Sequence, residues 1–266
     1  MPQLRALPAI LALTLAPGQT WAQAGGTAEL AQQLSNPVAD LISVPLQFNY
    51  DDGIGPNDGS RWTTNIQPVI PFSIGENWNV ISRTILPIIS QEDVTASGAH
   101  ESGTGDIVQS LFFSPKEPTA NGWVWGAGPV FLLPTGSDDF SADQWGIGPT
   151  AVALRVQGPW TYGALANHIW GFDANDGEDE INVSFLQPFA AYTTANAWTF
   201  TVNSESTYDW NTETWSVPVN AIVSKLVSLG TQPVSLAAGV RYWAEAPAGG
   251  PDDVGFRLAV TFLFPR

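Results

Sequence analysis

The feature that most restricts what this chain can fold into is a regular alternation of apolar and polar side chains. In the stretch WTFTVNSESTYDW, the apolar residues Trp198, Phe200 and Val202 are separated by polar ones. A period of two is that of a β-strand, because successive side chains of a strand point to opposite faces. A soluble sandwich would bury the apolar face, whereas a transmembrane barrel would turn it to lipid and enclose the polar face. Alternation alone leaves both folds open.

From Leu41 onward the sequence contains 12 strand-like segments of about ten residues or slightly more. This is the length that a tilted strand needs to cross a bilayer, and single-chain bacterial barrels have an even number of strands. The segments span residues 41–50, 61–73, 78–90, 104–114, 122–134, 144–156, 159–171, 181–193, 197–208, 214–227, 233–244 and 254–264.

The connections between these segments alternate in length and charge. The odd-numbered ones all contain Asp or Glu, and they are DDGIGPNDGS, QEDVTASGAHESG, TGSDDFSAD, FDANDGEDE, DWNTE and EAPAGGPDD. The even-numbered ones are shorter on average, with Glu76 and Glu117 as their only acids, and they are IGEN, SPKEPTAN, QGP, TTANA and SLGTQP. Transmembrane barrels have long loops on one side and short turns on the other. We therefore predict an all-β fold, a single antiparallel transmembrane β-barrel of about 12 strands with a short N-terminal helical segment.

Composition and aromatic placement favour the same fold. Charged residues make up 13% of the chain, against about a quarter in soluble proteins. The formal charge of −16 excludes nucleic acid as a partner, because phosphate binding needs basic patches. Aromatic side chains fall near both ends of the segments, as interfacial girdles do. Those near the acidic connections are Tyr50, Trp62, Trp145, Trp170, Tyr208, Trp210, Trp215, Tyr242 and Trp243, and those near the short turns are Trp78, Trp123, Trp125, Trp160 and Trp198.

The first residues have the pattern of a secretory signal. Arg5 precedes an apolar run over residues 6–15, and Ala22-Gln23-Ala24 resembles a cleavage site. The run is shorter than the roughly 20 residues of a spanning helix. We expect a cleaved signal peptide at 1–24, with Ala22 as the alternative site, and location in the bacterial outer membrane.

Residues 25–40 are expected to form a periplasmic N-terminal segment before the barrel of residues 41–266. Thr27 is placed to cap a short helix from Ala28 to Leu34, which Asn36-Pro37 would end. This segment either plugs the lumen or leads into the first strand.

The phase of the alternation assigns a face to each side chain. Apolar residues such as Phe48, Phe200 and Leu258 are expected to face lipid, and polar residues at the alternate positions are expected to face the lumen. Prolines within the segments remove donors from the ladder, so we expect bulges at Pro45, Pro68, Pro71, Pro87, Pro129, Pro149, Pro188 and Pro218. The predicted lumen-lining residues are Gln47, Asn49, Asn65, Gln67, Arg83, Asn203, Glu205, Asn220, Arg241 and Arg257.

Charged residues in this set form a candidate ladder across the lumen. Arg83, Arg241 and Arg257 would be set against Glu205 and Glu245. Such residues tune the selectivity of a channel. The alternative is a structural network of salt bridges that fills a narrow, closed barrel.

The sequence offers weak candidates for chemistry. His168 stands beside Asn167 in one segment and Ser184 lies in the next, and outer-membrane phospholipases use a Ser–His pair near the lipid boundary. His100 lies in an acidic loop, and residues 173–180 carry oxygen ligands but lack the calcium-loop spacing. We predict no catalytic residues, no metal and no cofactor.

Several stretches resemble one family, and they are AELAQQLSNPVADLISVPLQFNY, FFSPKEP, WGAGPVFLLPTG, GPWTYGALANHIW, FLQPFAAYTT, NSESTYDWNTETWSVPVN, GVRYWAEAP and TFLFP. They are similar to a proteobacterial outer-membrane β-barrel family of transporters, related to the outer-membrane proteins of the meta-pathway of phenol degradation. The resemblance implies passage of small, aromatic or hydrophobic molecules. Barrels of this kind commonly end on an aromatic residue, whereas here Phe264 is followed by Pro265 and Arg266.

The expected function is that of an outer-membrane channel or transporter for passive diffusion of small solutes. The expected partners are outer-membrane lipid, a small-molecule solute and the barrel-assembly machinery. Two alternatives stay open: a lipid-hydrolysing enzyme around His168, and a closed structural or adhesive barrel.

Overall fold

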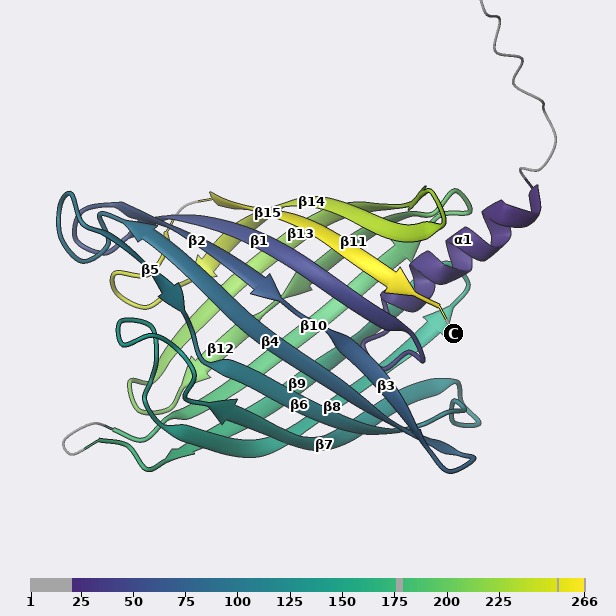
Figure 1. Ribbon diagram of the computed structural model, residues 1–266, viewed down its shortest axis with the longest axis horizontal. Coiled ribbons are helices and arrows are strands. Elements are labelled where there is room, and N and C mark those ends of the chain that lie inside the picture. The colour runs from purple at the N-terminus through teal and green to yellow at the C-terminus, as the bar shows by residue number, and fades with distance from the viewer. Residues whose placement is uncertain (1–20, 176–178, 253, 266) are drawn as a thin grey trace, which may run out of the picture.

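The computed structural model describes residues 21–175, 179–252 and 254–265, which form a closed antiparallel β-barrel of 12 strands with one helix at its N-terminal side (Figure 1). The predicted fold class is confirmed. The elements are α1 Trp21–Leu34, β1 Ile42–Ile54, β2 Gly59–Ile66, β3 Val69–Ile74, β4 Trp78–Glu92, β5 His100–Thr104, β6 Ile107–Pro115, β7 Trp123–Leu133, β8 Trp145–Gln157, β9 Trp160–Phe172, β10 Asn182–Thr193, β11 Trp198–Ser204, β12 Ser206–Asp209, β13 Thr214–Leu229, β14 Gln232–Glu245 and β15 Val254–Phe264.

Three of the 12 barrel strands are each interrupted once, so they carry two labels: β2 and β3, β5 and β6, and β11 and β12. The barrel closes where β1 pairs antiparallel with β15, from Ile42 opposite Phe264 to Tyr50 opposite Phe256. Each predicted segment coincides with one barrel strand. Closure matters physically because it leaves no strand edge to be satisfied within a membrane.

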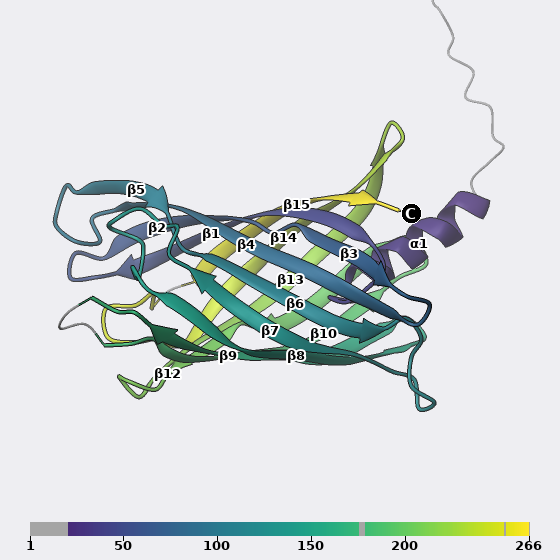
Figure 2. The same cartoon turned by 60° about the horizontal axis from the view of Figure 1, so that its bottom comes forward.

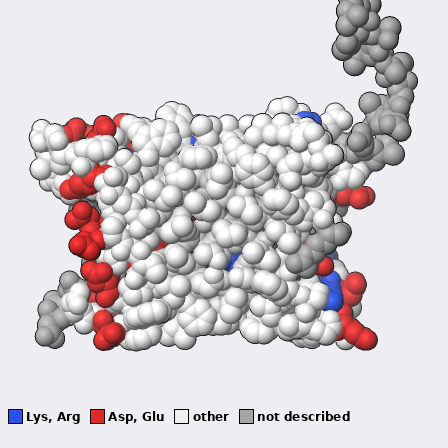
Figure 3. Space-filling model, in the orientation of Figure 1, with Lys and Arg blue, Asp and Glu red and all other residues white. Residues whose placement is uncertain are grey.

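The two ends of the barrel differ, and we call them the loop end and the turn end. The loop end carries the longer, acidic connections, and acidic side chains gather there in Figure 3, at the left. The turn end carries short turns, such as those at Gly158 and Gly230 with φ of 56° and 64°. Glycine adopts such left-handed values without steric cost, which allows these tight reversals.

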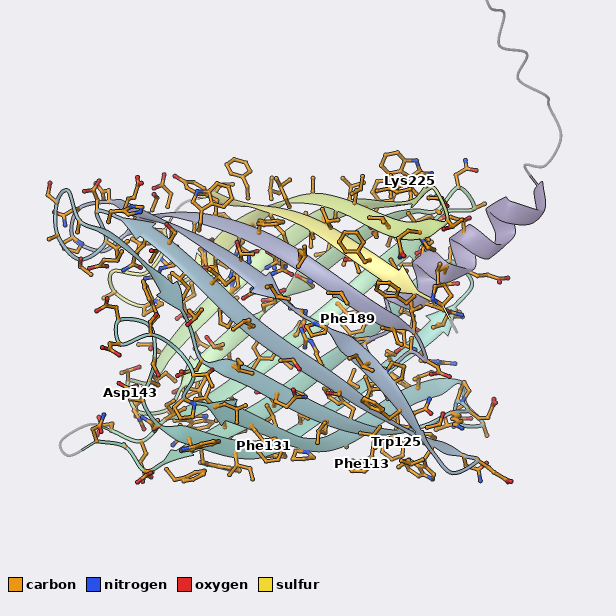
Figure 4. All side chains as sticks on the ribbon, in the orientation of Figure 1. Phe113, Trp125, Phe131, Asp143, Phe189 and Lys225 are labelled. Atoms are coloured by element: carbon orange, nitrogen blue, oxygen red, sulfur yellow. The ribbon has the colours of Figure 1, made fainter. Side chains whose placement is uncertain are left out.

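The exterior of the barrel wall is apolar. Phe200 and Val202 on β11 are 53% and 55% exposed, whereas Thr199 between β10 and β13 is buried. On β15, Phe256 and Leu258 are exposed and Arg257 is buried. Figure 4 shows Phe113 and Trp125 projecting from the outer surface. An apolar outer face is the arrangement of a transmembrane barrel, and the interior here holds polar side chains together with an apolar cluster around Phe112.

Exposed aromatic side chains mark both ends of this apolar wall. Trp62, Trp145, Trp170, Trp210 and Trp215 are exposed near the loop end, and Trp78, Trp123, Trp125, Trp160 and Trp198 near the turn end. Trp243 does not belong to the girdle in which the sequence placed it. Its indole Nε1 donates to Asp51 Oδ1 at 2.9 Å on the interior side, because residue 243 shares the inward phase of Arg241.

The expectation of bulges at the strand prolines is wrong for most of them. The register shifts between Val217 and Pro218 against β14, and β6 gains one residue relative to β5 opposite Pro87. At the remaining prolines the register is unchanged. Instead, backbone pairing with one neighbouring strand is absent for a few residues, as it is opposite Pro129 and Pro149. The missing donor is therefore accommodated by an unpaired step in a neighbouring strand rather than by an inserted residue.

Helix α1 begins earlier than predicted, at Trp21 instead of Ala28, and ends as predicted at Leu34. Figures 1 and 2 show it at the turn end, with its C-terminal end directed to the mouth of the barrel. The proposed signal peptide lies mostly outside the described residues. Among the described helical residues, none forms a helix long and apolar enough to cross a membrane.

Candidate functional site

A bidentate ion pair crosses the barrel interior. Arg257 on β15 donates from Nη1 and Nη2 to the two carboxylate oxygens of Glu205 at 2.8 and 2.7 Å, and its Nε donates to Asn49 Oδ1 at 2.7 Å. Glu205 lies between β11 and β12, and two strands, β13 and β14, separate it from β15 in the sheet order, so the contact runs through the interior. The Arg257 side chain is 3% exposed. Bidentate arginine–carboxylate geometry is strong and directional, which fixes the positions of both groups.

Amide side chains continue this ion pair around the interior wall. Gln47 donates to Asn49 at 3.3 Å, Gln67 contacts Gln47 at 3.5 Å, and Arg83 on β4 donates to Gln67 at 3.1 Å. We call the six residues from Glu205 through Arg257, Asn49, Gln47 and Gln67 to Arg83 the polar belt. The belt thus links β11/β12 to β4 by way of β15 and β1.

A cavity of about 450 Å³ lies on the loop side of the polar belt. Arg241 Nη1 lies 3.5 Å from Asp51 Oδ2, and its guanidinium carbon lies 4.5 Å from the Trp243 ring centroid. Arg61 Nε donates to Gln91 Oε1 at 2.9 Å. We call this space the loop-end cavity, and its lining is Gln47, Asn49, Asp51, Ile54, Arg61, Thr63, Asn65, Glu205, Ser216, Arg241, Trp243 and residues 247–251.

Two smaller cavities, of about 250 and 170 Å³, lie on the turn side of the belt, and the N-terminal segment lines both. The larger is bounded by the end of α1 and by polar side chains of β11, β13 and β14 such as Thr199, Asn203 and Ser235. The smaller is bounded by Leu34 and Pro37 of the segment, by Leu41 directly after it, and by Gln67 and Arg83. The segment therefore occupies space inside the turn end of the barrel.

Apolar contacts hold the N-terminal segment there. Val38 is buried in a cluster with Ile81, Phe112, Leu154 and Leu165. In a second cluster, Ala31 and Leu41 pack with Leu226 and Leu263. Gln32 Nε2 also donates to the carbonyl of Gly158 in a turn, at 2.7 Å.

The structure brings the ten residues that the sequence assigned to the lumen into one connected interior. Gln47, Asn49, Asn65, Glu205 and Arg241 line the loop-end cavity. Gln67 and Arg83 line one turn-end cavity and Asn203 lines the other. Asn220 is fully buried and donates to Asn203 at 2.8 Å, and Arg257 lies within the belt. That they line a conducting path stays a prediction.

The predicted charged ladder forms only in part. Arg257 pairs with Glu205, but Arg241 contacts Asp51 and Arg83 contacts Gln67. Glu245 is exposed, because the register shift at residue 244 places it opposite the outward residue Val217. Asp51, Arg61 and Trp243 also line the interior but are not among the predicted lumen residues. The odd–even phase of Asp51 and Arg61 matches that of Asn49 and Thr63 and is the signal that points inward.

His168 and Ser184 are brought together on the outer surface. Ser184 Oγ lies 2.8 Å from His168 Nδ1 and accepts a hydrogen bond from Trp210 Nε1 at 2.9 Å. In a serine hydrolase the serine contacts Nε2 and a third group orients Nδ1. Here Nε2 is buried without a partner among the described residues, and the alternation along β9 points Asn167 to the opposite face. The third group that this mechanism needs is therefore not supplied by Asn167.

The loop-end candidates form local contacts. His100 Nδ1 lies 3.3 Å from Glu92, and hydrogen bonds from Thr95 and Gln91 lower the pKa of Glu101 below its usual value. Within the described residues no group of three or more His, Cys, Asp or Glu side chains is placed to hold a metal ion. Part of the acidic stretch 173–180 lies outside the described residues.

These features define a transmembrane β-barrel whose interior holds a charged belt and a segment of its own chain. No protein-family model matches the sequence, and no curated protein matches it. The fold is similar to the crystal structure of an outer-membrane channel from Pseudomonas putida F1, with a TM-score of 0.65 at 14% identity over 84% of this chain and 94% of that one. It is also similar to outer membrane phospholipase A from Escherichia coli, with a TM-score of 0.51 at 12% identity over 91% and 98% of the two chains. At such identities the similarity shows the fold alone.

Proposed function

We propose that this protein is an outer-membrane channel for passive diffusion of small solutes, held closed at its turn end by the N-terminal segment. The main supporting observation is a pair of features inside the barrel: cavities with polar side chains in their lining on both sides of the belt, and a segment that lines both turn-end cavities. A barrel built only as an anchor would be filled by its own side chains and would need no such spaces.

The contacts of the segment support a removable plug. They include apolar side-chain contacts and the hydrogen bond from Gln32, and none of the described residues of the segment pairs with a strand of the wall. Local unfolding of a segment held by few contacts costs less than opening a strand. The loop end then faces the cell exterior and the segment faces the periplasm.

The test is single-channel conductance in a planar bilayer. The refolded chain from Gly25 onward is compared with a variant that lacks residues 25–40. Folding of both is verified by β-rich circular dichroism and by a heat-dependent gel shift. We expect the deletion to raise conductance or open probability at least several-fold. Silence of both folded proteins would reject the channel in favour of a closed barrel.

The family resemblance supports finer proposals. It suggests aromatic or hydrophobic solutes. The pattern of residues 1–24 adds export by a signal peptide cleaved after residue 24, and the barrel fold adds assembly by the general barrel machinery. These are checked by N-terminal sequencing of the protein from outer membranes and by solute-dependent block of the current. Outer-membrane lipid is the expected surrounding of the apolar wall.

The Ser184–His168 hydrogen bond is the one observation that favours a lipid-hydrolysing enzyme as a second candidate. That function predicts release of fatty acid from phospholipid by the purified barrel and its loss in His168→Ala. Wild-type protein that is folded and inert on phospholipid would remove this candidate. We favour the channel because the buried, unpartnered Nε2 leaves the ring without the orienting group of known Ser–His bases.

A further inference from the structure

From the interior arginines we infer the class of solute: the channel binds and passes small monocarboxylates that have an apolar body. This inference rests on the proposed function and goes further by naming the solute chemistry. Its basis is the unused hydrogen-bonding capacity of three arginines, placed on both sides of the polar belt.

Each arginine presents five N–H donors in a planar fork that matches a carboxylate. Arg257 uses its fork on Glu205 and Asn49. Arg241 has a 3.5 Å contact to Asp51, and its Nε has no hydrogen-bond partner among the described residues. Arg61 uses its Nε on Gln91, and Arg83 uses one Nη on Gln67. The Nε of Arg241 is buried, but among the described residues most Nη donors of Arg61, Arg83 and Arg241 have no partner and are left for a ligand or water.

These three arginines lie in series along the barrel. Arg61 and Arg241 line the loop-end cavity, and Arg83 lines a cavity on the turn side of the belt. A carboxylate that leaves the first pair therefore meets a further arginine before it reaches the N-terminal segment. Multiple weak sites in sequence are what conduction requires, because a single tight site would retain the solute.

The interior also differs in charge from the rest of the molecule. The linings and the belt contain Arg61, Arg83, Arg241 and Arg257 against Asp51 and Glu205, and Gln91 links Arg61 to one further carboxylate, that of Glu101. Positive side chains are therefore still in excess there. The whole chain has a formal charge of −16. Acidic loops at the mouth are solvated, and their field is screened within about 8 Å at physiological ionic strength. Inside the barrel, screening is weaker and the arginines dominate.

The apolar part of the proposed solute is inferred from the wall of the barrel at the turn end. Ile81, Phe112, Leu154 and Leu165 form a continuous apolar surface that Val38 covers. The lining of the larger turn-end cavity adds polar side chains, such as Thr199 and Ser235, among apolar ones. Once the segment moves, a solute would meet both apolar and polar side chains. This suits a molecule with an apolar body and one charged group better than a sugar or a dianion.

Binding can be tested separately from conduction. Isothermal titration of the folded protein from Gly25 onward in detergent uses sodium benzoate as the probe and benzamide as its neutral match. We expect saturable benzoate binding, no comparable benzamide binding, and affinity reduced about tenfold in Arg241→Gln and in Arg83→Gln, because charge-assisted hydrogen bonds are lost. Arg155→Gln is the control, since Arg155 lies over the Trp123 ring on the outer surface.

The matching electrical measurement is the reversal potential of the variant that lacks residues 25–40 in a KCl gradient. We expect preference for chloride over potassium, reduced in Arg83→Gln and unchanged in Arg155→Gln. Cation preference, or equal binding of benzoate and benzamide, would overturn the carboxylate inference while leaving the channel intact. Absence of current together with specific benzoate binding would instead overturn the proposed function and keep the site.

Discussion

At the scale of single residues, the Arg257–Glu205 pair determines the centre of the interior. The Arg257 side chain is almost fully buried and that of Glu205 is 21% exposed at the loop-end cavity, and two short hydrogen bonds join them. Loss of one partner from a buried pair is costly because the other charge remains buried and uncompensated. The pair therefore has a geometric role besides its effect on stability, because it fixes the position of the polar belt between the cavities.

We predict that Glu205→Gln lowers the free energy of unfolding by about 3 kcal/mol, because it leaves Arg257 without its counter-charge. Urea unfolding of the protein in lipid vesicles, followed by the heat-dependent gel shift, measures this. The double variant Glu205→Leu with Arg257→Met is the control and should recover much of the loss. Equal stability of Glu205→Gln and wild type would contradict the burial of an uncompensated charge.

At the scale of elements, the strands could be predicted from the sequence and the interruptions could not. Alternation depends on neighbours along one strand, so Phe200 and Asn203 reveal their faces locally. The sequence shows where the prolines are, but whether a proline interrupts a strand depends on how the neighbouring strands pair with it. Pro188 on β10 and Pro218 on β13 lie on either side of the break at Glu205, and only the three-dimensional pairing places them there.

The contact of the N-terminal segment with the wall was likewise beyond sequence reasoning. Val38 reaches Phe112 and Leu154, which lie far along the chain, and nothing in their spacing marks a shared cluster. The prediction of the ten lumen residues uses only the alternation along each strand. The prediction that Trp243 belongs to the girdle uses only its residue type. Its inward phase, two positions from Arg241, was the available signal.

Gly126 on β7 offers a test of how the segment closes the barrel. A Cβ atom on residue 126 would lie 3.2 Å from Val38 Cγ1 and 3.2 Å from Phe112 Cβ. We predict that Gly126→Val displaces the segment and raises conductance towards that of the 25–40 deletion. Ala127→Val is the matched control, because its added methyl groups face the outer side of the same strand. If Gly126→Val folds and conducts like the wild type, Val38 does not close the path.

At the scale of the whole molecule, the charge separation along the barrel axis is partial: acidic side chains are concentrated at the loop end, and the turn end carries fewer, among them Glu76 and Glu117, together with basic ones (Figure 3). Acidic loops occupy the loop end, and Asp143 in Figure 4 lies there, whereas Lys225 lies near the turn end. Among the described residues, the basic side chains outside the interior are Lys116, Arg155 and Lys225, all near the turn end. Lys225 lies over the Trp198 ring and donates to the carbonyl of Asn196, and such basic and aromatic pairs suit a phospholipid headgroup layer.

This separation predicts the orientation of the barrel. The chain has no cysteine, so a single introduced cysteine reports one position. Asp139→Cys places a thiol in an exposed loop at the loop end, and Thr231→Cys places one in an exposed turn at the turn end. A maleimide carrying a large polyethylene glycol cannot pass the outer membrane, so on intact cells it should label Asp139→Cys and leave Thr231→Cys unlabelled. Permeabilised cells are the control, in which both should react. The reverse pattern on intact cells would mean that the acidic loops face the periplasm and that the N-terminal segment closes the barrel from outside, because strand number and turn positions fix the two ends relative to each other.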